Sequence, residues 1–172
     1  MKAKESQIEK SPASLSTAGA PRKNFSGVIR APREADHVRL ADLAGQLSYP
    51  STPQEISRRL AGMANSSEHA AFVAEMPNGE IAGWIAVFVL RGLEVDPRGE
   101  ISGFIVDERF RSQAVGQHLL ARAEQWVSDR GCDVVALRSN VIRDRAHAFY
   151  MREGYQHTKT QKSFRKKLAN KS

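Results

Sequence analysis

The stretch ISGFIVDERFRSQAVGQHLL, residues 101–120, has the pattern of a strand, a short polar loop and a helix. Its first part is apolar, small and polar residues fill its middle, and its end begins the apolar face of a helix. A loop that enters a helix leaves backbone N–H groups unpaired, and the helix dipole favours negative charge at that end. Arg111 adds a positive charge, and Gly116 lets the backbone approach a ligand. The stretch predicts an anion site, although an ordinary strand-to-helix turn has a similar composition.

Two features further along the chain favour the anion site. Residues 137–140 (LRSN) end a short apolar strand pattern, and residues 146–155 (AHAFYMREGY) form a helical pattern that stops at Gly154. Ala146 and Tyr150 are four residues apart, so they share one face of that helix. The loop is therefore followed by a second strand and helix that carry polar and aromatic side chains.

Together these motifs resemble those of the GNAT N-acetyltransferase superfamily. Its phosphate loop reads Arg/Gln-x-x-Gly-x-Gly/Ala, which residues 111–116 (RSQAVG) match. Its later signature, Asn…Ala-x-x-Phe-Tyr-x-x-x-Gly-Phe/Tyr, is matched from Asn140 to Tyr155, and the resemblance covers about residues 25–168. One residue departs from the pattern: Ala114 replaces the first loop glycine, which costs little if the backbone there is helical.

The resemblance implies that acetyl-CoA binds where two central strands splay apart. The strand before the loop would pair through its backbone with the pantetheine arm, at Phe104, Ile105 and Val106. The loop would hold the pyrophosphate, through Arg111, Ser112, Gln113, Ala114, Val115, Gly116 and Gln117. The amide of Asn140 would contact the pantetheine arm.

Acetyl transfer to an amine needs a base for the ammonium and an acid for the leaving thiolate. Glu100 begins the central strand at the spacing where histone acetyltransferases of this superfamily carry their base, so the resemblance implies Glu100 as base, directly or through a water. Glu94 and Asp96 in the preceding loop are alternatives. Tyr150 matches the tyrosine that protonates the thiolate in many members. The residues alone leave open a solvated glutamate at a strand edge and an amphipathic core tyrosine.

The rest of the chain predicts the surrounding fold. The patterns give the order β α α β β β α β α β β, at residues 25–30, 34–47, 51–63, 69–75, 80–90, 100–106, 115–127, 133–137, 145–151 and two strands within 155–168. Asn78-Gly79 between two apolar runs indicates a hairpin. We expect an α/β (α+β) fold, with helices on both faces of one mostly antiparallel sheet. The resemblance adds that this GNAT-like sheet is splayed at the cofactor site.

The positive charge is concentrated at the two ends. The 172 residues carry a net charge of +7, with +3 on residues 1–23 and +6 on residues 159–172, which leaves −2 on residues 24–158. We therefore interpret residues 1–23 as a flexible basic leader and residues 24–172 as the N-acetyltransferase domain. The slightly acidic body argues against nucleic acid as the partner and favours a cationic acceptor such as an aminoglycoside.

Composition excludes several further classes. The longest apolar run, residues 81–90, is about half a bilayer span, and residues 1–23 lack the apolar stretch of a signal peptide. We expect a cytoplasmic protein with no membrane partner. The single cysteine, Cys132, excludes an internal disulfide and a thiolate zinc cluster, and no metal site is expected. Dimers are common in the superfamily, so the resemblance leaves a homodimer open.

The expected function is transfer of the acetyl group of acetyl-CoA to a primary amine, by direct attack in a ternary complex. The acceptor is a small molecule, with aminoglycoside-like amines included, or a peptide. A non-catalytic acyl-CoA-binding regulator on the same fold is the alternative, which Ala114 makes conceivable.

Overall fold

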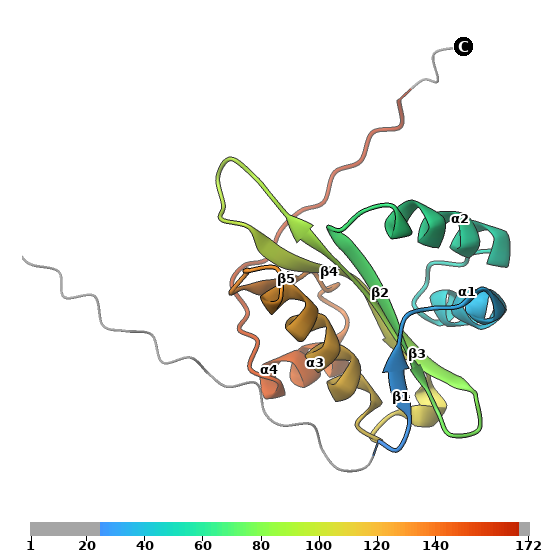
Figure 1. Cartoon of the computed structure of the whole chain (residues 1–172). Helices are drawn as coiled ribbons and strands as arrows, with labels where there is room; N and C mark the ends of the chain where they lie inside the picture. Colours follow the sequence, from blue (N-terminus) through green and yellow to red (C-terminus); the bar gives the residue numbers. More distant parts are fainter. Residues whose placement is uncertain (1–24, 169–172) are drawn as a thin grey trace, which may run out of the picture.

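The computed structural model describes residues 25–168, which form one five-stranded sheet with helices on both faces (Figure 1). The strands follow one another across the sheet in chain order, and the first three pairings are antiparallel whereas the last is parallel. Their bounds are β1 Val28–Arg30, β2 His69–Glu75, β3 Ile81–Leu90, β4 Arg98–Val106 and β5 Val135–Leu137. The expected mixed fold with a mostly antiparallel sheet is confirmed.

The helices lie in two layers (Figure 1). On one face lie α1 (His37–Gln46) and α2 (Pro53–Ala64), and on the other α3 (Val115–Ser128) and α4 (Asp144–Arg152). Two short 3-10 turns, η1 (Glu34–Asp36) and η2 (Glu108–Phe110), precede α1 and the loop before α3. The two helix layers therefore enclose the sheet.

Local sequence signals explain two of these elements. Asn78-Gly79 turns the chain between β2 and β3, with Gly79 at a φ of +82° that a residue with a side chain rarely adopts. Helix α2 begins with a reciprocal cap, in which Thr52 accepts from the backbone N–H of Glu55 and the Glu55 carboxylate accepts from that of Thr52. Both signals are short-range, which is why the sequence predicts them.

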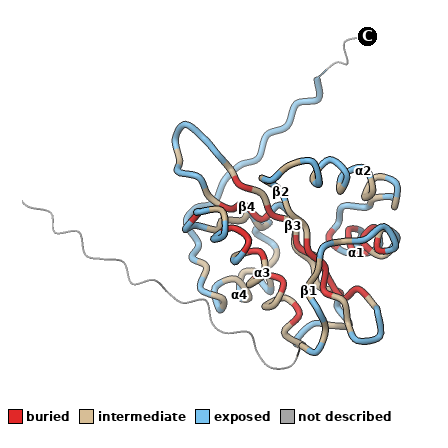
Figure 2. The backbone as a smooth tube through the Cα atoms, viewed as in Figure 1, coloured by how far each residue is buried: buried red, intermediate tan, exposed pale blue. Residues whose placement is uncertain are grey.

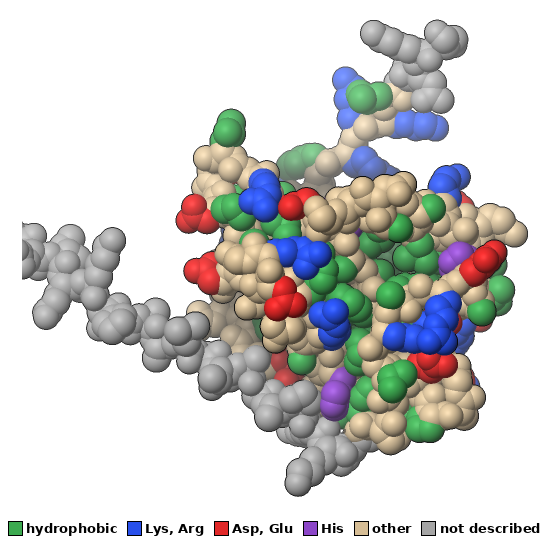
Figure 3. Space-filling model, viewed as in Figure 1, with side chains coloured by type: hydrophobic (Ala, Val, Ile, Leu, Met, Phe, Trp, Pro, Cys, Tyr) green, Lys and Arg blue, Asp and Glu red, His purple; other side chains and the backbone are tan. Residues whose placement is uncertain are grey.

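The two strands expected within residues 155–168 are wrong, because this part of the chain contains no strand. Residues 156–168 are exposed throughout (Figure 2), and basic side chains gather along them (Figure 3). Phe164 and Leu168 are their only large apolar side chains, and they are 88% and 74% exposed. So little apolar surface cannot offset the entropy of ordering a strand. The leader expected over residues 1–23 lies outside the described residues.

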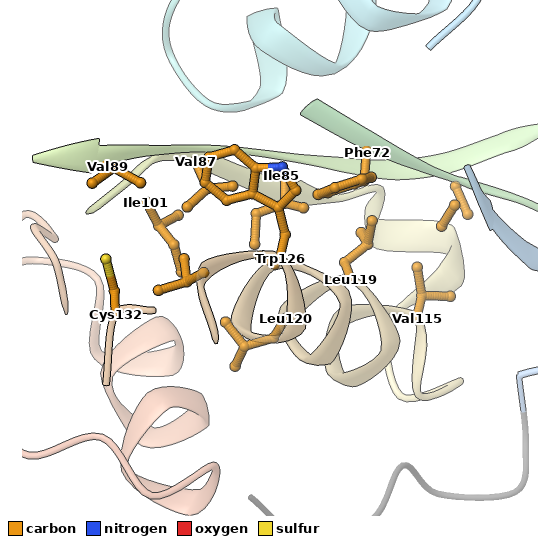
Figure 4. Close-up of a cluster of buried hydrophobic side chains, with 14 residues drawn as sticks. Phe72, Ile85, Val87, Val89, Ile101, Val115, Leu119, Leu120, Trp126 and Cys132 are labelled. Atoms are coloured by element: carbon orange, nitrogen blue, oxygen red, sulfur yellow. The ribbon is translucent and has the colours of Figure 1, made fainter. Parts of the chain in front are cut away.

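The main apolar core lies between the sheet and α3 (Figure 4). Ile85, Val87 and Ile101 on the sheet pack against Leu119 and other residues of α3. Cys132 is buried at the edge of this cluster, as expected of a small apolar side chain. A smaller cluster on the opposite face comprises Leu40, Leu43, Val73 and Ile81. The larger core fixes α3, and hence the loop before it, against β4.

Strand β4 has a bulge and then separates from β5. Ala86 of β3 pairs with Gly103 and Val87 pairs with Ile101, so Ser102 is an extra residue on β4. The parallel pairing of β4 with β5 runs only over Gly99, Glu100 and Ile101. From Ser102 to Val106 no strand of the described chain pairs with the side of β4 that faces β5. The sheet is therefore splayed at the position expected from the sequence.

Candidate active site

The loop before α3 presents a row of unpaired backbone donors. His118 N donates to Ala114 O at 3.1 Å, which is the first hydrogen bond of the helix. Within residues 25–168, the backbone N–H groups of residues 112–117 donate to no other residue. Arg111 is exposed at the start of this loop and forms no ion pair with a described carboxylate. The arrangement suits an anionic group such as a pyrophosphate.

The backbone of Ala114 is not helical, so alanine at this position has a conformational cost. It is the N-cap of α3, with φ 60° and ψ 2°, which is the left-handed region. Ser112 is also left-handed, with φ 65°. A residue with a side chain costs roughly 1–2 kcal/mol there. The loop therefore keeps the backbone shape that a glycine would favour, at the expense of local strain.

Gly116 allows close packing beside the loop. A β-carbon at Gly116 would lie 3.4 Å from the rings of Phe104 and Phe149. The bare face of Gly116 thus points between β4 and α4, where the sheet is splayed. Phe104, Ile105 and Val106 pair with β3 on one side and have no strand partner on the other. Their free edge can pair with an extended ligand, as the resemblance implies.

Asn140 lies just beyond β5, at the other side of the splay. It is exposed, and its Oδ1 accepts a hydrogen bond from the backbone N–H of Ile142 at 3.2 Å. This contact fixes the orientation of the side chain, while its NH₂ group donates to no described residue. Asn140 therefore offers a donor on the side of the gap opposite β4.

Tyr150 belongs to an aromatic cluster between α4 and β4. Its ring centroid lies 6.2 Å from that of Phe104 and 5.6 Å from that of Phe149. Burial raises the pKa of the Tyr150 phenol above its ordinary value, and the nearby positive charge of Arg143 opposes this with a smaller effect. The phenol thus stays protonated at neutral pH, and it makes no hydrogen bond within the described chain. The phenol proton remains available to donate.

Glu100 is buried, with only 4% of its surface exposed. Its Oε2 lies 3.5 Å from Nη2 of Arg98, and its Oε1 lies 3.3 Å from Nε of Arg138. Glu100 Oε2 is fully buried and accepts no hydrogen bond from the described residues. The sequence predicted Glu100 but neither of these arginines. The alternation of β4 places Arg98 on the same face as Glu100, and that signal could have been used.

The two alternative acids lie elsewhere. Glu94 and Asp96 are exposed in the loop that joins β3 to β4, at the end of β4 opposite the loop before α3 (Figure 1). Neither forms an ion pair within the described residues. The structure therefore keeps them apart from the aromatic cluster and the splayed strands.

Asp107 is a second buried acid, which the sequence reading did not single out. It directly follows β4 and accepts hydrogen bonds from Arg109, Arg39 and Gln46. Burial alone would raise its pKa, but these donors outweigh burial and hold the pKa well below its ordinary value. Asp107 thus ties the start of the loop to α1. An Asp at the N-cap of a short turn was the available signal.

Two absences hold for the described part of the chain. Between residues 25 and 168, no three His, Cys, Asp or Glu side chains are grouped so that they could hold a metal ion. None of the helices in the same range is both long and apolar enough to cross a membrane.

Comparison with known proteins identifies this arrangement of strands, loop and aromatic cluster. A family model described as the acetyltransferase (GNAT) family matches residues 38–155, which is more than half of the chain. The chain belongs to this GNAT acetyltransferase family. It is an acetyl-CoA-dependent N-acetyltransferase, as the motifs of the loop and of α4 predict.

Two curated relatives and one solved structure illustrate the similarity. An aminoglycoside N(6')-acetyltransferase type 1 of Stenotrophomonas maltophilia is 30% identical over 81% of this chain and 93% of its own length. An aminoalkylphosphonate N-acetyltransferase of Salmonella typhimurium is 38% identical over 45% of this chain and 51% of its own. Glucosamine-6-phosphate N-acetyltransferase of Arabidopsis thaliana is 24% identical with a TM-score of 0.70, over 81% of this chain and 98% of the other.

Proposed function

We propose that this GNAT enzyme acetylates the primary amine of a small molecule by direct attack in a ternary complex. The observation that carries the proposal is the row of free N–H groups over residues 112–117, beside the unpaired edge of β4. Such N–H groups suit a phosphate, and an unpaired strand edge can pair with an extended chain. Both relatives are named for acetylating amines of small molecules, aminoglycosides in one case and aminoalkylphosphonates in the other.

The proposal assigns acetyl-CoA binding to the residues named above. The bound thioester would supply an activated acetyl group. The loop from Arg111 to Gln117 would bind its pyrophosphate through N–H groups and one guanidinium, and the edge from Phe104 to Val106 would align the pantetheine arm. The free NH₂ group of Asn140 would donate a hydrogen bond to the pantetheine arm from the opposite side. These contacts hold the reacting carbon still, which is itself a large part of catalysis.

Two side chains would move the protons. Glu100 would accept a proton from the ammonium of the acceptor, directly or through a water, because a protonated amine has no electron pair for attack. Tyr150 would donate its phenol proton to the departing sulfur. The raised pKa of Tyr150 favours this role, because the phenol is fully protonated at neutral pH.

A thiol-release assay with a panel of amines tests the proposal. Wild-type protein should release CoA only when an amine is present. Arg111→Gln removes one charge-assisted hydrogen bond and should raise the KM for acetyl-CoA about tenfold with kcat nearly unchanged. Tyr150→Phe should lower kcat about 100-fold with the same KM. The exposed Arg91, paired with Glu68 away from the loop, provides the control Arg91→Gln.

The same assay can also contradict the proposed function. Tight CoA binding without release on any amine would favour the non-catalytic acyl-CoA-binding regulator instead. Loss of activity in Arg91→Gln equal to that in Arg111→Gln would contradict the phosphate role of the loop.

A homodimer and a cytoplasmic location complete the proposal. The outer edge of β5 pairs with no strand of residues 25–168, and Phe164 and Leu168 are largely exposed. Unpaired strand edges and exposed apolar side chains are common contact points between subunits. Light scattering after size-exclusion chromatography should give twice the mass of one chain. A single-chain mass at concentrations up to assay levels and above would contradict the dimer.

A further inference from the structure

Three charged side chains gather on one face of the sheet where β4 and β5 part. Arg98 and Glu100 are two residues apart on β4, so they point to the same face. Glu100 is in register with Ala136 of β5, and Arg138 stands two residues beyond Ala136. The contacts of Glu100 with both arginines confirm that the three side chains meet. We call them the Arg98–Glu100–Arg138 cluster.

This cluster is incompletely satisfied. Glu100 Oε2 and Arg98 Nε are both fully buried, and neither has a hydrogen-bond partner within the described residues. The contacts of 3.5 and 3.3 Å are ion pairs, and neither has the geometry of a hydrogen bond. A buried carboxylate without donors is costly and normally has a reason. Here the unsatisfied oxygen, Glu100 Oε2, lies where β4 and β5 separate. The substrate amine must also bind there to reach the thioester.

Arg138 controls access to the carboxylate. Its side chain is 79% exposed, whereas that of Glu100 is 5% exposed. The guanidinium of Arg138 lies against Oε1, and Oε2 is fully buried. An ammonium group arriving from solvent therefore meets the positive charge of Arg138 before it meets Glu100. As long as Arg138 stays in this position, the carboxylate is shielded from amines.

The cluster carries more positive than negative charge. It contains two guanidinium groups and one carboxylate. Arg143, close enough to Tyr150 to affect its phenol, donates to the carbonyl of Leu47 and pairs with no carboxylate of the described chain. An acceptor that carried only positive charge would be repelled here, whereas an anionic group would find the guanidinium of Arg138, with that of Arg98 beside it.

We propose that the acceptor is a small primary amine that also carries an anionic group, a phosphonate, phosphate or carboxylate, one to three carbons from the nitrogen. This rests on the proposed function and specifies its substrate class. The anionic group binds the guanidinium of Arg138 and draws it away from Glu100. The ammonium of the same molecule then takes the place of Arg138 at the carboxylate. The anionic group and the ammonium of one short molecule thus form new ion pairs with Arg138 and Glu100, which replace the Arg138–Glu100 pair.

The reaction then balances without another reactant. One ammonium proton passes to Glu100, and the freed nitrogen forms a bond to the thioester carbon. The carbon–sulfur bond breaks, the sulfur takes the phenol proton of Tyr150, and the second proton of the nitrogen is lost to water. Glu100 releases its proton to solvent and the phenolate regains one from solvent, so one proton is released overall. The products are the amide of the anionic amine and free CoA.

The test compares one pair of amines that differ mainly in charge, together with two further amines. β-Alanine and β-alaninamide have nearly the same shape, but only the first carries a carboxylate; 2-aminoethylphosphonate carries a stronger anion, and kanamycin carries only positive charge. Wild-type kcat/KM should be ten- to a hundredfold higher for β-alanine than for its amide, because a charge-assisted hydrogen bond is gained. The phosphonate, with its stronger anion, should be at least as good an acceptor as β-alanine, and kanamycin should be the poorest.

Variants tie this preference to Arg138. Arg138→Gln should bring the ratio of β-alanine to β-alaninamide close to one, mainly through the KM for β-alanine. Arg138→Lys keeps the charge and should restore part of the ratio. Arg91→Gln is the matched control, since Arg91 is 57% exposed and its Nε lies 3.2 Å from Glu68. It should leave the ratio unchanged.

The outcomes separate the two proposals. Release of CoA with β-alaninamide or kanamycin at rates equal to or above β-alanine would overturn the anionic-acceptor proposal and leave the acetyltransferase function standing. An unchanged ratio in Arg138→Gln would overturn it too. Absence of CoA release with every amine would count against the proposed function as well.

Discussion

The two buried acids of β4, Glu100 and Asp107, differ in how completely they are satisfied. Asp107 is 1% exposed and receives hydrogen bonds from a backbone N–H and from three side chains. Glu100 is 4% exposed and receives none from the described residues. Both carry a charge that burial penalises, but only Asp107 is fully compensated. Asp107 therefore holds the fold together, whereas Glu100 is the acid that we propose for the chemistry.

The largest expected effect separates activity from stability at Glu100. Glu100→Gln removes the proposed base and should lower kcat/KM about 100-fold or more. Its free energy of unfolding should fall by about 1 kcal/mol, because two ion pairs are lost but no hydrogen bond is, and Arg138 is 79% exposed. Amine-dependent CoA release and urea unfolding measure the two quantities. Glu68→Gln removes the partner of Arg91 and serves as control; retention of more than a third of the activity in Glu100→Gln would exclude its role as base.

At Asp107 we expect the opposite of Glu100, namely that a substitution mainly lowers stability. Asp107→Asn leaves Arg39 and Arg109 without their carboxylate and should lower the free energy of unfolding by about 2 kcal/mol. This is less than the ~3–5 kcal/mol of a fully buried pair, because Arg109 is 58% exposed. Urea unfolding at pH 7 checks it. A stability equal to wild type would mean that the contacts of Asp107 do not hold the loop to α1.

Acid provides an independent check on Asp107. Its pKa in the folded protein is lowered below the ordinary value of 3.8, so the unfolded chain binds protons more readily. The stabilising contribution is therefore complete above about pH 5 and is lost as the pH falls toward the folded pKa. Wild type should lose more stability than Asp107→Asn between about pH 5 and pH 2. Parallel acid titrations of the two proteins would contradict this account.

The smallest expected effect concerns the loop. Ala114→Gly relieves roughly 1–2 kcal/mol of left-handed strain but adds about 0.4–1 kcal/mol of freedom to the unfolded chain. The net gain should be about 0.5 kcal/mol, or a rise of about 1–2 °C in Tm. Ala121→Gly within α3 should instead destabilise by about 1 kcal/mol. A fall in Tm for Ala114→Gly would show that the loop tolerates its alanine without strain.

Short-range patterns predicted most of the fold. The Asn78-Gly79 turn, the Thr52 cap and the apolar face of α3 each depend on neighbours within a few residues, so the sequence alone contains them. The strands expected after Tyr155 failed for the converse reason. A weak alternation among lysines becomes a strand only if it gains apolar contacts, and residues 156–168 are exposed throughout and pair with no strand.

The sequence predicted which residues form the candidate site, but it did not predict the side chains and backbone conformation around them. The motifs located the loop, Glu100 and Tyr150, and the structure places Tyr150 beside Phe104 and the loop ahead of α3. The sequence could not show that Arg138, thirty-eight positions from Glu100 in the chain, contacts it. Nor could it show the left-handed backbone of Ala114, since alanine has no preference for it. Both depend on tertiary structure.

The bulge at Ser102 makes the number of residues in β4 a functional property. Before it, odd-numbered Gly99 and Ile101 face α3, and after it even-numbered Phe104 and Val106 do. Without Ser102, the side chains of one half of β4 would point to the opposite face of the sheet. Either the aromatic contacts of Phe104 or the position of Glu100 would be lost, whatever side chains were kept. A one-residue deletion in β4 should therefore be more severe than most substitutions in the strand.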